Sequence, residues 1–270
     1  LNYDDERIAE IKDKLTKHWL ERRVRVMGYG FSTGDVKASH DQLLAGEDGS
    51  LWPRGLSFKI NYGSDSIPLS IPAIVAREQA QAVLAALAVG QALGLPWLKM
   101  TEVMTTFVPP PGRLRPRAGI KKTLLMDDPY NSSPAALAAA LELIKKIPVT
   151  GRRVVVLGDM LELGTQTMTA HRAAGVAVAA VTDFLITVGP RAKFIAEAAD
   201  KKRFGKRKMK HFDESSEVGQ FLQNFLQPGD LALFKASQAV RLERAVLEVM
   251  AEPARRAELL VRQDRDWLNR

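Results

Sequence analysis

The stretch Asp127-Asp128-Pro129-Tyr130-Asn131-Ser132-Ser133-Pro134 connects a short apolar run to an alanine-rich run. The apolar run, residues 122–126, has the length of a strand, and residues 135–141 predict a helix with proline in its first turn. Acidic, phenolic and amide side chains therefore lie at the carboxyl end of a strand, beside helix N–H groups that attract anions. The stretch predicts a site for a nucleotide or a phosphorylated substrate.

The composition indicates a globular protein with one large domain or two ordinary ones, since 46% of the 270 residues are apolar and 26% are charged. No apolar stretch approaches the roughly 20 residues of a membrane span, and the polar opening is unlike a signal peptide. Without cysteine no disulfide can form, which is compatible with the cytosol. The net charge of +8 favours anionic partners, among them nucleotides, nucleic acid and acidic metabolites.

Three consecutive prolines in Val108-Pro109-Pro110-Pro111-Gly112 predict a domain boundary, because proline interrupts both helix and sheet. We place one domain at 1–108 and another at 109–270. Alternation and helical periodicity in the first domain predict strands at Arg23–Met27, Leu56–Ile60 and Ile67–Ile71, and helices at Ala76–Leu93 and Leu98–Phe107.

After the boundary, strand-like and helix-like segments alternate. This order predicts an α/β domain with a parallel sheet, right-handed crossovers and helices on both faces. The expected strands are Thr123–Met126, Val154–Leu157, Phe184–Val188, Met209–Phe212 and Leu231–Phe234, and the expected helices are Ala135–Lys146, Thr169–Ala180, Ala192–Ala199, Ser216–Leu226 and Ala239–Met250.

Two more strand ends carry polar residues. Gly158 and Asp159 follow one buried strand, an arrangement more typical of a turn than of a site. Lys235 and Ser237 follow another, and a lysine there either holds a carboxylate or phosphate or is solvated. His171, alone in the next predicted helix, is expected to be structural or solvated.

The densest charge cluster is Lys201–Lys210, with seven basic residues in ten. It could contact nucleic-acid phosphates, but it contains no nucleic-acid-binding motif, so a solvated loop is the favoured interpretation. The sequence has no G-x-x-x-x-G-K-[ST] motif, and the spacing in Gly28–Gly34 does not match a dinucleotide-binding loop.

Taken in order, these motifs resemble the Mur ligases, in particular the members that add D-alanyl-D-alanine to UDP-N-acetylmuramoyl-tripeptide. The resemblance rests on an ordered set of segments, namely Pro111–Arg113, Asp127–Pro134, Val156–Gly164, His171-Arg172, Lys235–Ser237 and Arg241–Glu243.

Leu1–Asp5 is similar to an L-N-x-D-D segment late in the family's central ATPase domain. The resemblance thus implies a partial central α/β ATPase domain at 1–108 and a Rossmann-like carboxyl-terminal domain at 109–270. It also implies that the amino-terminal domain, the P-loop and the magnesium-binding residues have no counterpart here. We expect this portion to be inactive alone, cytoplasmic and monomeric.

The implied function is an ATP-dependent amide ligase that makes a peptidoglycan precursor through an acyl phosphate. ATP and magnesium are the implied cofactors, and UDP-N-acetylmuramoyl-tripeptide and D-alanyl-D-alanine are the implied substrates. The resemblance places Arg113, Asp128, Tyr130, Asn131 and Ser132 near ATP, and Lys235 and Ser237 near the dipeptide, without a complete catalytic set or a metal site.

Departures from the family pattern weaken two contacts. Glu78, Gln79 and Ala82 stand where the family usually has a His-Asn pair and a further Asn near adenine, and Gln238 replaces a common arginine. Two alternatives stay open: a non-catalytic module that binds polyanions or nucleic acid, and a related amide ligase with another amino acid, as in folylpolyglutamate synthases.

Overall fold

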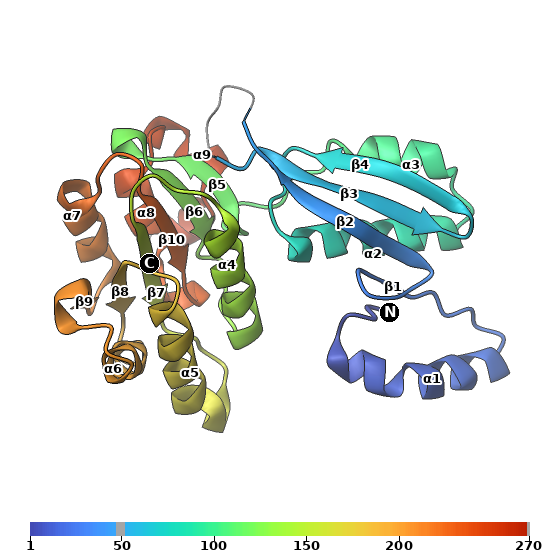
Figure 1. Cartoon of the computed structure of the whole chain (residues 1–270), viewed down its shortest axis with the longest axis horizontal. Coiled ribbons are helices and arrows are strands. Elements are labelled where there is room, and N and C mark those ends of the chain that lie inside the picture. Colours follow the sequence, from blue (N-terminus) through green and yellow to red (C-terminus); the bar gives the residue numbers. More distant parts are fainter. Residues whose placement is uncertain (47–51, 269–270) are drawn as a thin grey trace. The chain divides into compact units, whose positions relative to one another are not determined.

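The computed structural model describes residues 1–46 and 52–268, and the chain divides into two compact units, Leu1–Pro109 and Pro110–Arg270 (Figure 1). Among the helices of these described residues, none combines the length and the apolar content that a membrane span requires.

The first unit contains a four-stranded sheet in the order β1-β2-β3-β4, and α2 packs on it. Strands β2, β3 and β4 form an antiparallel meander, whereas β1 pairs in parallel with β2. Its elements are α1 (Glu6–Glu21), β1 (Tyr29–Gly30), β2 (Val36–Leu44), β3 (Gly55–Tyr62), β4 (Asp65–Ile71), α2 (Arg77–Ala92) and α3 (Trp97–Met104).

The acid pair near the start of this unit has structural roles. Asp5 caps α1 by accepting hydrogen bonds from the N–H groups of Arg7 and Ile8. The Asp4 carboxylate accepts hydrogen bonds from the N–H groups of Phe31 and Ser32, at 2.6 and 2.9 Å. These contacts fix the first turn of the unit to the loop after β1.

Most elements expected in this unit are present, with one exception. The predicted strand Arg23–Met27 is wrong: Arg23 has a φ of 59°, and the residues after it form no sheet pairing before β1. Alternation alone was misleading because Val24 is exposed and has no neighbouring strand to pack against.

The second unit is an α/β domain with a six-stranded sheet in the order β5-β6-β10-β7-β8-β9. All neighbouring strands are parallel except β5, an antiparallel edge strand that the sequence did not predict. The strands are β5 (Arg115–Ala118), β6 (Leu124–Asp128), β7 (Arg153–Gly158), β8 (Phe184–Val188), β9 (Met209–Phe212) and β10 (Leu231–Lys235); the main helices are α4 (Pro134–Lys146), α5 (Thr167–Ala179), α6 (Lys193–Lys201), α7 (Ser215–Phe225) and α8 (Glu243–Val249).

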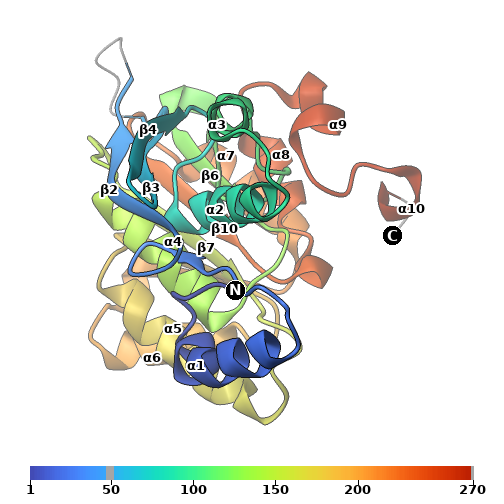
Figure 2. The same ribbon diagram turned by 90° about the vertical axis from the view of Figure 1, so that its right-hand side faces the viewer.

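The strand order determines which face each helix covers. From β6 through β9 the chain progresses in one direction across the sheet, and β10 then returns between β6 and β7. Right-handed crossovers place helices before and after such a reversal on opposite faces. Accordingly, α7 and α8 share a core with Val154 and Val156 on one face, and α4 lies on the other (Figures 1 and 2).

Beyond α8 the chain continues as a carboxyl-terminal segment with short helical turns, α9 (Arg256–Leu259) and α10 (Arg265–Leu268). Residues 251–268 were not predicted to form any element. Leu260 packs into the core on the α7–α8 face, so this segment is part of the folded unit.

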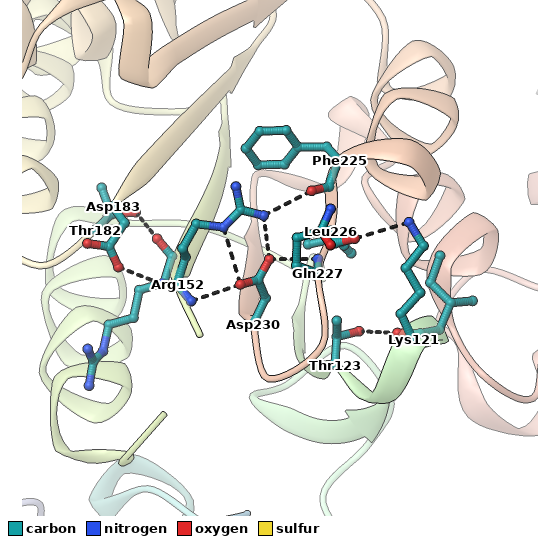
Figure 3. Close-up of polar contacts among 11 residues, drawn as sticks. Lys121, Thr123, Arg152, Thr182, Asp183, Phe225, Leu226, Gln227 and Asp230 are labelled. Carbon is teal, nitrogen blue, oxygen red and sulfur yellow. Dashed lines mark hydrogen bonds and ion pairs between the residues drawn. The ribbon is translucent and has the colours of Figure 1, made fainter. Parts of the chain in front are cut away.

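The amino-terminal edge of the sheet is closed by polar contacts that Figure 3 shows. The Asp230 carboxylate, just before β10, accepts hydrogen bonds from the backbone N–H of Arg152 at 2.8 Å, from Arg152 Nη2 at 2.6 Å and from the N–H of Gln227 at 2.9 Å. The Arg152 guanidinium also lies 4.4 Å from the centre of the Phe225 ring. The start of β7 and the turn before β10 are therefore fixed together.

We expect Asp230→Asn to destabilise this unit by about 2–3 kcal/mol, because a neutral amide cannot replace a buried carboxylate that accepts several hydrogen bonds. Burial alone would raise the pKa of Asp230, but bonds from Arg152 and Gln227 outweigh it and lower the pKa. Its stabilising contribution is therefore present above the ordinary pKa and is lost as pH falls through the lowered value. Urea unfolding at neutral and acidic pH measures both effects.

Asp183→Asn is the matched control, because Asp183 lies at the same edge but is exposed and accepts one bond, from the N–H of Arg153. It should change the free energy of unfolding by less than about 1 kcal/mol. Equal effects of the two substitutions would contradict the role assigned to Asp230.

Candidate functional site

The carboxyl ends of three adjacent strands meet at one edge of the second unit. Lys235 at the end of β10 is in register with Asp128 of β6 and Leu157 of β7. The helices that follow β6 and β10 lie on opposite faces, so this edge is a topological switch point of the sheet. Ligands of open α/β sheets bind at such points.

A cleft of about 760 Å³ opens at this edge. Its volume is in the range of small-molecule sites. The loops after β6, β7 and β10 and the carboxyl-terminal segment line it, through Tyr130, Asn131, Leu161, Glu162, Ser237, Gln238, Ala239, Arg241 and Trp267.

Beneath the cleft, Lys235 and Asp128 form a buried ion pair. Lys235 Nζ donates to Asp128 Oδ2 at 2.6 Å and to the backbone oxygen of Asn131 at 3.0 Å. The side chains of Lys235 and Asp128 are 2% and 6% exposed, respectively. The lysine predicted to hold a substrate carboxylate thus pairs with the acid predicted to contact ATP, and both stay predictions as ligand contacts.

The two acids of β6 also hold the loop that precedes β5. The N–H of Gly112 donates to Asp127 Oδ2 at 3.3 Å, and the N–H of Leu114 donates to Asp128 Oδ1 at 3.2 Å. Asp127 is fully buried and accepts a further bond from Arg117 Nε at 2.8 Å. The acid pair therefore holds the backbone at and after Pro111–Arg113 in place, which explains why the two motifs occur together.

Arg113 and the residues after Asp128 occupy different positions relative to the cleft. The Arg113 guanidinium lies 4.0 Å from the centre of the Tyr130 ring, and Tyr130 and Asn131 line the cleft. Ser132 is buried, and its N–H donates to Asn131 Oδ1 at 2.9 Å. The predicted residues are therefore brought together, but Ser132 lies behind the cleft surface.

Asp159 and Ser237 join the neighbouring loops. The backbone oxygen of Asp159 accepts from the N–H of Ser237 at 2.9 Å, and Ser237 Oγ accepts from the N–H of Leu161 at 2.8 Å. Asp159 Oδ1 accepts from the N–H of Ala192 at 2.7 Å, ahead of α6. Ser237 lines the cleft, whereas Asp159 is buried and shapes the loops around it.

His171 is structural, which was one of the two roles expected for it. It is fully buried, its Nε2 accepts from the N–H of Met160 at 3.0 Å, and its Nδ1 lies 2.7 Å from the backbone oxygen of Thr167. These partners require a neutral ring that carries its proton on Nδ1. The ring supports the loop after β7 from below.

Several cleft residues had no role in the sequence interpretation. Glu162 and Arg241 have left-handed backbone conformations, with φ of 62° and 61°, in the loops after β7 and β10. Both occur within the motifs quoted above. Their position in loops between a strand and a helix could have identified them as candidate site residues. Trp267 carried no signal, because neither periodicity nor a motif connects it to the sheet.

Buried arginines hold the carboxyl-terminal segment against the cleft. Arg262 donates to the backbone oxygen of Pro129 and lies 3.5 Å from Glu243, while Arg241 pairs with Glu243 and donates to the backbone oxygen of Trp267. Both guanidinium groups lie within 6 Å of the Trp267 ring. The segment therefore forms one wall of the cleft.

Burial raises the pKa of Asp128 to about 6, although Lys235 and the N–H of Leu114 act in the opposite direction. We expect the contribution of this group to stability to be greatest below about pH 4 and to fall by ~3 kcal/mol as pH rises to about 7. The sign follows because the folded unit binds this proton more tightly than the unfolded chain does. The difference in unfolding free energy between the unsubstituted chain and Asp128→Asn, measured across this pH range, tests it; a constant difference contradicts it.

The described residues hold no cluster of side chains that would bind the implied magnesium by themselves. Within residues 1–46 and 52–268, no group of three or more His, Cys, Asp or Glu side chains is arranged to hold a metal ion. Asp128 pairs with Lys235 and Glu243 with arginines, whereas Glu162 lines the cleft. We therefore derive no step through a metal.

Comparison with known proteins identifies the fold and its family. Residues 112–238 match the family described as "Mur ligase, glutamate ligase domain". Residues 112–238 form a domain of the Mur ligase family. The six-stranded, mostly parallel sheet of the second unit confirms the α/β architecture expected for the carboxyl-terminal domain.

Two curated Mur ligase relatives are named UDP-N-acetylmuramoyl-tripeptide–D-alanyl-D-alanine ligase. The protein of Bacillus subtilis is 36% identical over 130 residues, which is 48% of this chain and 28% of the relative. The protein of Synechocystis is 32% identical over 255 residues, which is 93% of this chain and 49% of the relative. The chain thus spans half or less of the length of these relatives.

A solved Mur ligase structure gives the same fold. The MurF ligase of Thermotoga maritima, in complex with ADP, superimposes with a TM-score of 0.71 and covers 91% of this chain and 53% of its own. At 22% identity this likeness supports the fold alone.

Proposed function

We propose that this chain forms part of an ATP-dependent ligase that adds D-alanyl-D-alanine to UDP-N-acetylmuramoyl-tripeptide in the cytoplasm. The observation that carries the proposal is the shared name of the two relatives, one of which aligns along 93% of this chain. The cleft at the carboxyl edge supports it, because its position and size suit a small substrate.

The cleft has the chemistry of a site for a small zwitterion. Glu162 supplies a carboxylate and Arg241 a guanidinium, and Asn131, Ser237 and Gln238 supply neutral polar groups. A dipeptide has an ammonium at one end and a carboxylate at the other, so these side chains complement both ends. We propose that the dipeptide binds here, above the Lys235–Asp128 pair, which keeps the loops in position.

The chemistry of the proposed reaction is the formation of an amide from an acyl phosphate and the amine of the dipeptide. This unit would orient that amine and neutralise the carboxylate of the dipeptide. Both are positioning roles. We propose that ATP contacts Arg113, Tyr130 and Asn131 from the same side, and that Lys235 acts through Asp128 and Asn131 and not by contact with substrate.

The test combines this chain with the amino-terminal portion of the Synechocystis relative. We expect the mixture or the fused protein to convert UDP-N-acetylmuramoyl-tripeptide, D-alanyl-D-alanine and ATP to the pentapeptide precursor, detected by mass spectrometry. Glu162→Gln should raise the KM for the dipeptide about tenfold or more, with little change in the KM for ATP.

A matched control is Glu142→Gln, since Glu142 is exposed on α4 and does not line the cleft. A folded, ATP-hydrolysing fusion that makes no pentapeptide would refute the proposal. Product formed only with glutamate, and not with D-alanyl-D-alanine, would support the related amide ligases instead.

A further inference from the structure

A cluster of positive charge extends from the end of α6 to the start of β9. Its members, which we call the basic loop, are Lys201, Lys202, Arg203, Lys206, Arg207, Lys208 and Lys210, and all seven side chains are exposed. Without these seven cations the net charge of the chain falls from +8 to +1. Nearly all of the excess positive charge is therefore concentrated in ten residues.

The basic loop lacks ion pairs to the carboxylates that the structure describes. Among the described residues, none of its seven cations forms an ion pair, although exposed cations elsewhere do, such as Arg255 with Glu252 and Glu258. Lys193, on the preceding helix, pairs with Asp213. The field of the loop is thus directed toward solvent, where it attracts anions.

The basic loop lies away from the cleft within the same unit. It precedes β9, which runs parallel to β8, so it lies at the amino-terminal edge of the sheet, whereas the cleft lies at the carboxyl-terminal edge. Strand β9 is also the last strand of the sheet. A large anionic surface can therefore approach the loop without covering the cleft.

The side chains favour a lipid surface over a nucleic acid. Five of the seven cations are lysines, which act as point charges, while bidentate phosphate and base contacts favour arginine. The nearby rings are partly buried and covered: Lys208 Nζ lies 5.7 Å from the Phe204 ring centre and Lys210 Nζ lies 4.1 Å from that of Phe221. No exposed ring of the loop is left for base stacking.

We propose that the basic loop binds the surface of anionic phospholipid bilayers and holds this unit at the membrane by charge alone. The contact requires no insertion, because the exposed side chains of the loop are cationic and not apolar. This proposal is independent of the ligase assignment, since it uses none of the cleft residues.

The test is sedimentation of the chain with vesicles rich in phosphatidylglycerol, compared with phosphatidylcholine vesicles. The triple variant Lys206→Gln, Arg207→Gln, Lys208→Gln should lower the partition coefficient about 100-fold, at roughly fivefold for each cation removed. Binding should also weaken strongly between about 0.1 M and about 0.5 M salt.

The matched control is Lys14→Gln, Lys17→Gln, Lys99→Gln, which removes the same charge from exposed positions in the first unit. It should bind vesicles nearly as well as the unsubstituted chain, with both variants folded by circular dichroism. Equal loss in both variants, or no binding to the anionic vesicles, would overturn the proposal. So would tighter binding to a duplex oligonucleotide that displaces the vesicles.

Discussion

Replacement of Lys235 by methionine is expected to destabilise the second unit by about 3–5 kcal/mol, because it leaves Asp128 buried without its partner. Methionine fills the space of the lysine stem but donates no hydrogen bond. The Asn131 backbone oxygen, which accepts from Lys235 Nζ, also loses that donor. Urea unfolding monitored by circular dichroism at neutral pH measures the loss.

The double variant Lys235→Met, Asp128→Leu distinguishes a lost ion pair from lost packing. An apolar pair in place of a buried ion pair is often neutral or stabilising, so the double variant should recover most of the loss. If it is as unstable as Lys235→Met, the space around the pair matters and the charge does not.

The same double variant separates structural from ligand-binding roles of Lys235. In the reconstituted ligase, a folded double variant should keep its KM for the dipeptide within a few fold if Lys235 makes no contact with the dipeptide and the apolar pair holds the adjoining loops as the ion pair did. A large rise in that KM would instead support the direct contact with the dipeptide carboxylate that the family resemblance implies.

The second unit was largely predictable because its strands are buried on both faces. Continuous apolar runs, such as residues 154–157, identify parallel strands without reference to partners. The start of a helix could also be predicted where it depends on neighbouring residues alone. Ser133 caps α4 by accepting a hydrogen bond from the N–H of Ala136, and Pro134 follows it.

Elements that depend on distant partners were not predictable. Arg115–Ala118 has no apolar run, and it becomes β5 only because the backbone of β6 is available for antiparallel pairing. Conversely, Arg23–Met27 alternates like a strand but pairs with nothing. Sheet formation at an edge depends on which neighbour is present, and local sequence does not contain that information.

The convergence of the site was predictable, but its internal pairing was not. Parallel strands bring their carboxyl ends to one edge, which is why Asp128, Gly158 and Lys235 lie at the same edge of the sheet. That Lys235 bonds to Asp128, 107 residues earlier in sequence, depends on exact register and on the loop at Asn131. Residues assigned to ligands by resemblance thus prove to be bonded to one another.

Replacement of Arg262 by methionine is expected to detach the carboxyl-terminal segment from the cleft and to destabilise the unit by about 3–5 kcal/mol. Arg262 is 2% exposed, contacts Glu243, which is 1% exposed, and donates to the backbone oxygen of Pro129. Without it, Glu243 keeps only its pairing with Arg241 and retains a buried negative charge. The cleft wall that includes Trp267 should then open.

Limited tryptic digestion measures this opening, because the segment carries exposed arginines at positions 255, 256 and 265. If the free energy of local opening falls by about 3 kcal/mol, the rate of cleavage in this segment should increase on the order of 100-fold. The control Arg265→Met removes an exposed arginine from the same segment and should leave cleavage after the other two unchanged. Similar cleavage there in Arg262→Met and in the unsubstituted chain would show that the buried arginine does not hold the segment in place.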